Sequence, residues 1–222
     1  MWDWDNAIEV FPLILKGLQV TLIATVFGAA LSYVLGLIFA LLRMSRLGWI
    51  RTITYWVVEF IRTTPLVVQL FFLFYFFVPN VLGIRPADPL LVGIIGLGLH
   101  YAGYTSEVYR AGIEGVPRGQ WEAATALSLP RARVWRAVIL PQAIPKVLPA
   151  LGNYTIAMFK ETPLLIVLGG VNEMVNMAKG FGGRQFSYVE AYTEVAAIFL
   201  VLSVSAALLV QLMERRLGRQ RV

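Results

Sequence analysis

The sequence predicts an all-α integral membrane protein, and three observations lead to that fold class. Hydrophobic residues make up 58% of the chain and charged residues only 14%. The mean hydropathy is +0.71. Apolar runs recur along the chain at about the length of 20 residues that a helix needs to cross a bilayer. A soluble domain needs more polar surface than this, because it faces water on every side.

Five apolar segments predict five transmembrane helices within one domain that covers residues 1–222. We expect these helices at about 18–42, 55–79, 90–112, 149–170 and 189–213. No connection is long enough to hold a separate soluble domain, and the longest polar interruption covers about 113–148. The first residues are acidic and aromatic and lack the basic region of a cleavable signal peptide. We therefore expect the N-terminus to be retained.

Lysine and arginine predict the orientation of these helices. One side of the membrane receives few of them, namely Lys16, Arg85, Lys179 and Arg184. The other side receives most, which are Arg43, Arg46, Arg51, Arg62, Arg110, Arg118, Arg131, Arg133, Arg136, Lys146, Arg215, Arg216, Arg219 and Arg221. The positive-inside rule makes the basic side cytoplasmic, with the N-terminus outside and the C-terminus inside. The net charge of +6 is thereby explained by membrane topology, so no nucleic-acid partner is implied.

The polar interruption at 113–148 predicts two short helices at the membrane face. Strong helix formers from Glu122 to Leu127 predict the first. A second is expected from about Arg131 to Leu140 and should end at Pro141. These residues fit a docking surface for another protein or an amphipathic connector that lies on lipid headgroups, and composition leaves both open.

This segment also carries a specific motif. Glu122-Ala123-Ala124, then Ser128 after three residues, and Leu140-Pro141 further on resemble the EAA signature of bacterial ABC importer permeases. In that family the segment is a coupling helix that docks on the ATP-hydrolysing subunit, and the small alanines would allow a close approach. Ser128 stands where the family usually has glycine, which permits a left-handed turn. We therefore expect a different bend at Ser128.

The resemblance extends to a second segment. Arg62-Thr63-Thr64-Pro65-Leu66, followed by Gln69, is similar to the R-G-T-P-L-x-x-Q segment of the polar amino-acid subfamily, with Thr63 in place of glycine. The resemblance implies a type I ABC importer fold in the bacterial cytoplasmic membrane. It also implies a second permease subunit, identical or related, two cytoplasmic ATP-binding subunits and an extracytoplasmic solute-binding protein.

Lys160-Glu161-Thr162 predicts a polar site inside the fourth apolar segment. Ionisable residues at membrane depth are costly, and they indicate a functional site by default. Pro163 disfavours helical geometry at Thr162, and broken helices at mid-membrane are a recurring way to hold zwitterions. Glu161 would accept an ammonium or amidinium group, while Lys160 or the following helix start would face a carboxylate. The alternative is an ion pair that only stabilises the helix bundle.

Two further residues are candidates for the solute pathway. His100 lies in the third apolar segment with Tyr101 and Tyr104, and we favour an interhelical hydrogen bond over contact with solute. Gln69 is a polar residue among apolar neighbours in the second segment. Glu107 and Arg110, three residues apart, predict a structural ion pair.

The chain is expected to transport rather than catalyse. It has no G-x-x-x-x-G-K-[ST] loop, so ATP and Mg²⁺ should bind the partner ATPase and this chain should bind no cofactor. Cysteine is absent and histidine occurs once, so no metal site is predicted. The resemblance of the EAA and Arg62–Gln69 segments therefore implies a permease for polar amino acids or related zwitterions such as ectoine. The competing functions are a secondary carrier driven by an ion gradient and a membrane scaffold without transport.

Overall fold

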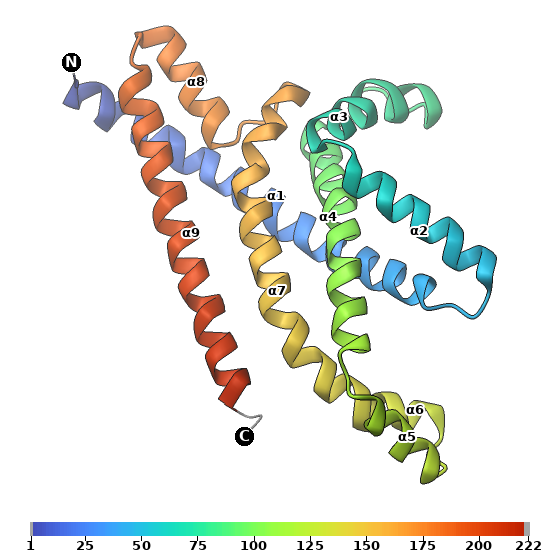
Figure 1. Ribbon diagram of the computed structural model, residues 1–222. Helices are drawn as coiled ribbons and strands as arrows, with labels where there is room; N and C mark the ends of the chain where they lie inside the picture. Colours follow the sequence, from blue (N-terminus) through green and yellow to red (C-terminus); the bar gives the residue numbers. More distant parts are fainter. Residues whose placement is uncertain (1, 220–222) are drawn as a thin grey trace.

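The computed structural model describes residues 2–219, and Arg221 of the predicted basic tail lies outside them. Within this range every regular secondary-structure element is a helix. The beginning of the chain, α3 and α8 lie at one end of the molecule, and α5 and α6 lie at the opposite end (Figure 1). The prediction of an all-α chain is confirmed.

The first helix, α1 (Trp4–Arg43), begins much earlier than the predicted membrane segment. Asp3 starts it, because its carboxylate accepts the backbone N–H of Asp5 at 2.9 Å. α1 runs obliquely past α9, α7 and α4, so it touches most of the molecule (Figure 1).

The second predicted membrane helix is broken. It consists of α2 (Gly48–Thr63), α3 (Leu66–Phe71) and the π-helical segment η1 (Phe72–Val81). Pro65 separates α2 from α3, and Thr64 before it is extended, with ψ at 139°, as the residue before a proline prefers. The two parts are bent by 105° relative to each other.

The remaining long helices are α4 (Pro89–Glu114), α7 (Leu140–Glu161) and α9 (Tyr188–Arg219). α7 runs directly into the 3-10 helix η3 (Thr162–Leu168), so the type of helix changes next to Pro163. Thr162 nevertheless keeps helical dihedrals, with φ of −55° and ψ of −30°, which corrects the expectation that Pro163 disfavours them. α8 (Met174–Gln185) was not anticipated and lies between η3 and α9. The largest buried apolar cluster joins α1, α3, α4, α7 and η3.

Length and composition single out fewer membrane helices than five. α1 and α9 are each long and apolar enough to cross a bilayer, and the bent pair of α2 with α3 and η1 would make a third. α4 and α7 do not meet that test, and both carry polar side chains at positions that packing buries or half buries. The count of five spans therefore stays a prediction.

Small residues form the buried face of α1. They recur every three or four positions and include Thr21, Ala24, Gly28, Ser32, Gly36 and Ala40. A Cβ atom at Gly36 would collide with the side chain of Thr105 in α4, and one at Gly17 would lie 2.8 Å from the Met174 backbone. Thr105 in turn donates its hydroxyl to the Ser32 carbonyl oxygen at 2.9 Å. This pattern is typical of closely packed membrane helices.

Candidate functional site

A partly buried polar cluster lies between α3, α4 and the end of α7. His100 Nδ1 lies 3.2 Å from the Gln69 side-chain oxygen, and Tyr101 donates its phenol proton to Glu161 at 2.9 Å. His100 and Tyr101 are both buried. The structure thus gathers three of the predicted pathway residues, namely Gln69, His100 and Glu161. The expected interhelical hydrogen bond of His100 is confirmed.

Gln69 also stabilises the break between α2 and α3. Its amide group donates to the Ile61 carbonyl oxygen at 2.8 Å and to the Thr64 hydroxyl at 2.6 Å. Pro65 has no N–H to continue the helical ladder, and the Gln69 amide satisfies polar groups that the break leaves free. Gln69 therefore links the bend of the second segment to His100 in α4.

The three predicted residues at the end of α7 point in different directions. Glu161 contacts Tyr101, whereas Thr162 is buried and donates its hydroxyl to the Phe159 carbonyl oxygen at 2.8 Å. Lys160 is exposed and forms no ion pair with any residue of the described range. The alternative of a Lys160–Glu161 ion pair is not realised here, because adjacent helical residues point about 100° apart.

Lys160 shares one exposed face of α7 with a second polar residue. Asn153 lies two helical turns before it and is also exposed. Tyr154 is half-buried beside them, and its ring packs at 5.6 Å from that of Tyr104. At the mid-membrane depth that the sequence predicts for this segment, an exposed charge would need protein or water opposite it, because lipid contact would be costly.

The predicted coupling segment forms a compact unit at the other end of the molecule. α5 (Arg118–Ala126) packs on the π-helical η2 (Val134–Ile139), which directly follows α6 (Arg131–Arg133), with Trp121 edge-on to Trp135 at 5.7 Å. Glu122 and Ala123 are exposed, and Leu127 is 72% exposed at the tip. A surface made of an acidic, a small and an apolar side chain thus faces away from the helix bundle.

Three expectations for this segment are corrected. Ala124 is only 3% exposed, so it packs inside the unit and cannot offer a surface to a partner. Pro141 does not end a helix, because η2 runs directly into α7 at Leu140, and the wider π turn precedes the proline that lacks an N–H. Ser128 has φ of 49°, so it adopts the left-handed turn that glycine favours rather than a different bend.

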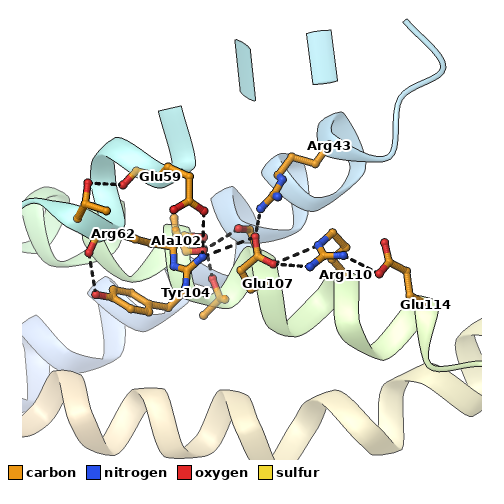
Figure 2. A network of polar contacts seen from close by, with 12 residues as sticks. Arg43, Glu59, Arg62, Ala102, Tyr104, Glu107, Arg110 and Glu114 are labelled. Carbon is orange, nitrogen blue, oxygen red and sulfur yellow. Dashed lines mark hydrogen bonds and ion pairs between the residues drawn. The ribbon is translucent and has the colours of Figure 1, made fainter. Parts of the chain in front are cut away.

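An ion-pair network at the ends of α1, α2 and α4 extends well beyond the predicted pair (Figure 2). Arg110 binds Glu107 at 2.8 Å, which confirms that pair, and also binds Glu114 at 2.6 Å. Glu107 further pairs with Arg43 and lies 3.9 Å from Arg62. The sequence places Arg43 and Arg62 far from Glu107, so only the packing of α1 and α2 on α4 brings them together.

Glu173 is a buried carboxylate that the sequence did not single out. It lies between the expected fourth and fifth membrane segments and accepts the backbone N–H groups of Val175 and Asn176 at 2.7 Å each, which caps α8. Burial raises its pKa to about 7, against the lowering effect of these two hydrogen bonds. An acidic residue just before a helical pattern was the available signal.

Comparison with known proteins identifies the family. Residues 32–219 match the family described as binding-protein-dependent transport system inner membrane component. The chain is 44% identical over 226 residues to the probable amino-acid ABC transporter permease protein y4tG of Sinorhizobium fredii, covering 100% of this chain and 96% of that one. It is 32% identical over 217 residues to the glutamine transport system permease protein GlnP of Escherichia coli, covering 97% and 98%.

Solved structures agree with this assignment. The crystal structure of an amino acid ABC transporter with histidines contains a chain that is 34% identical, with a TM-score of 0.89 and coverage of 97% of this chain and 99% of that one. An inward-facing MetNI methionine ABC transporter chain, 20% identical with a TM-score of 0.76, shares the fold. The chain therefore belongs to the inner membrane components of binding-protein-dependent transport systems and is an ABC transporter permease subunit rather than an enzyme.

Proposed function

We propose that this chain forms half of a translocation pathway for polar amino acids, in an importer with a second permease, two cytoplasmic ATP-binding subunits and an extracytoplasmic solute-binding protein. It is one domain with five membrane-spanning segments, the N-terminus outside and the C-terminus in the cytoplasm. ATP and Mg²⁺ bind the ATPase partners. The names of relatives that carry glutamine, arginine, or glutamate and aspartate support an amino acid as solute.

The observation that carries this proposal is the separation of two charges at the break of α7. Glu161 faces the cluster with Tyr101, Gln69 and His100, whereas neighbouring Lys160 is exposed on another face. A zwitterion needs one anionic and one cationic partner, and a broken helix provides both at adjacent positions. Glu161 is assigned to the ammonium or side-chain cation, and Lys160 to the carboxylate. Thr162 begins the 3-10 helix, and its hydroxyl donates to the Phe159 carbonyl oxygen of α7.

The exposed face of α7 supports the pairing with a second permease. Asn153 and Lys160 lie on that face, and lipid contact there would leave a charge unsolvated. A second permease opposite this face would enclose a wet pathway between the two chains. Glu122, Ala123, Ser128, Leu140 and Pro141 belong to the unit that transmits movement of the ATPases to α7, since η2 continues into α7 without a break.

Reconstitution tests the proposal directly. The chain, its genomically neighbouring permease and ATPase, and the binding protein are placed in proteoliposomes, and uptake of labelled polar amino acids and ectoine is measured with ATP present or omitted and with or without an ion gradient. Uptake that requires ATP and the ATPase supports the importer and identifies the solute. Uptake driven by the gradient alone supports a secondary carrier instead.

The orientation has its own test, because the chain has no cysteine. Single cysteines at Gly180 in α8 and at Ser45 between α1 and α2 are labelled in intact cells with a membrane-impermeant maleimide. We expect Gly180→Cys to react and Ser45→Cys to react only after permeabilisation. The reverse pattern would invert the proposed topology, and equal labelling of both in intact cells would contradict the span count.

A further inference from the structure

We propose that a basic pocket between α1, α2 and α4 binds the phosphate group of an anionic phospholipid. The pocket has a volume of about 340 Å³ and lies beside the ion-pair network of Figure 2. Its lining consists of Arg43, Arg51, Thr52, Tyr55, Arg110 and Glu114. Three guanidinium groups and two hydroxyl groups thus face one carboxylate, in a space of the size of small-ligand sites, which cover about 300–1,000 Å³.

The charges of the pocket are not balanced by its own carboxylates. Arg43 and Arg110 form ion pairs with Glu107, and Arg110 also pairs with Glu114. Arg51 forms no ion pair within residues 2–219 and is exposed, so all five of its N–H donors are available. A guanidinium fork binds phosphate or carboxylate oxygens in two parallel hydrogen bonds, so a phosphate group matches these donors.

The hydroxyl groups add donors at the same place. Neither Thr52 nor Tyr55 donates its hydroxyl to any atom in the part of the chain that the structure describes. The Tyr55 ring lies under the Arg43 guanidinium, with 5.1 Å from the Cζ atom to the ring centroid. This contact holds Arg43 at the wall of the pocket while its charge is shared with Glu107.

The position of the pocket favours a lipid over a soluble phosphate. The pocket lies where the expected membrane segments at 18–42 and 90–112 end on the basic side. In the proposed topology this places it at the cytoplasmic surface of the membrane, at the depth of the lipid headgroups. The lipid-facing side of α2 carries exposed Trp49, Ile53 and Trp56 at helical spacing. Tryptophan and tyrosine concentrate at headgroup depth, and basic pockets between helices on the cytoplasmic side bind anionic headgroups.

Native mass spectrometry of the purified transporter complex in detergent tests this site. The complex is titrated with phosphatidylglycerol, with phosphatidylcholine, and with soluble glycerophosphoglycerol. We expect phosphatidylglycerol to bind in preference to the other two. Arg51→Gln should weaken its binding about fivefold, since one basic residue near the surface contributes roughly that factor. The matched control Arg216→Gln removes a charge from the same predicted side on α9 and should leave binding unchanged.

Three outcomes would overturn the inference. Equal binding of the two lipids would remove the anionic preference, and equal losses in Arg51→Gln and Arg216→Gln would indicate diffuse surface attraction. Binding of glycerophosphoglycerol as tight as that of the lipid would make this a site for a soluble phosphodiester. The experiment requires no transport, so its failure is distinct from a failure of the importer function. An unchanged melting temperature of Arg51→Gln excludes misfolding as the cause of any loss.

Discussion

Tyr101 and Glu161 meet in the interior of the molecule, where the phenol of α4 donates a hydrogen bond of 2.9 Å to the carboxylate at the end of α7. The contact fixes one oxygen of Glu161 just before the helix breaks into η3. The other oxygen accepts no hydrogen bond within residues 2–219. Glu161 is therefore oriented by its own chain while it keeps acceptor capacity for a cationic ligand.

Removing the hydroxyl group of Tyr101 should weaken solute binding without abolishing transport. In Tyr101→Phe the carboxylate loses the group that orients it, and a hydrogen bond to a charged group contributes about 1.5–3 kcal/mol. We expect the KM of ATP-dependent uptake to rise roughly tenfold. Tyr192→Phe, on α9 and more exposed, should leave the KM unchanged. An unaltered KM in Tyr101→Phe at normal expression would contradict the role of Tyr101 in orienting Glu161 for the solute.

Reversing the charge of the coupling unit should uncouple transport from ATP hydrolysis. Glu122 is exposed on α5, so Glu122→Lys should fold normally and reach the membrane. We expect uptake in proteoliposomes to fall at least tenfold because the partner surface meets the wrong charge. The control Glu214→Lys changes the same charge on α9 and should keep most of the uptake. Normal uptake by Glu122→Lys would rule out docking through this residue.

Glycine at the left-handed position should stabilise the loop after α5. Ser128 has φ of 49°, a conformation that costs a non-glycine residue on the order of 1 kcal/mol. Ser128→Gly should raise the thermal midpoint of the purified chain or slow proteolysis of this loop. Ser128→Val should do the opposite, because a β-branched side chain tolerates that conformation poorly. A lower midpoint for the glycine variant would show that the serine hydroxyl contributes more than the backbone strain.

Loss of Glu107 should destabilise the junction of α1, α2 and α4. Glu107→Gln leaves the guanidinium groups of Arg43, Arg62 and Arg110 facing a neutral amide, and we expect a cost on the order of 2–3 kcal/mol. Glu114→Gln breaks a more exposed pair with Arg110 and should cost under about 0.5 kcal/mol. Thermal unfolding of the two variants gives the comparison, and equal midpoints would contradict a central role for Glu107.

Glu173 should make stability fall as pH rises. Its folded pKa of about 7 exceeds its ordinary value of 4.5, so the folded state binds more protons between these values. The contribution is fully present below pH 4.5, declines as pH rises towards 7 and is lost above it. We expect the thermal midpoint to fall between pH 5 and 8, and to fall less in Glu173→Gln than in the control Glu9→Gln. Parallel pH profiles would contradict this assignment.

Much of the helical arrangement follows from sequence pattern, and the exceptions have physical causes. The end of the α-helical ladder at Pro163 was predictable because proline cannot continue it, but the chain tightens into a 3-10 helix and Thr162 stays helical. The same reasoning failed at Pro141, where the preceding π turn accommodates the proline and the helix continues. The bend of 105° at Pro65 is not predicted, because apolar residues continue on both sides of the proline and indicate one continuous segment.

The candidate site was predictable residue by residue but not as an arrangement. Gln69, His100 and Glu161 stood out because each is polar in an apolar segment. Their sequence separations give no hint that Gln69 contacts His100 or that Tyr101 contacts Glu161, which depends on how α3, α4 and α7 pack. The left-handed Ser128 was missed because the environment of the turn overrides the local preference of serine.

The close packing of α1 on α4 has a mechanical consequence. Where Gly36 meets Thr105, and where Ser32 accepts the Thr105 hydroxyl, the two helices touch with no flexible side chain between them. Rotamer changes cannot relieve such a close contact, so we expect α1 and α4 to move together as one body. We therefore expect the bending that accompanies transport to occur at Pro65 and at the change of helix type next to Pro163, rather than within the α1–α4 pair.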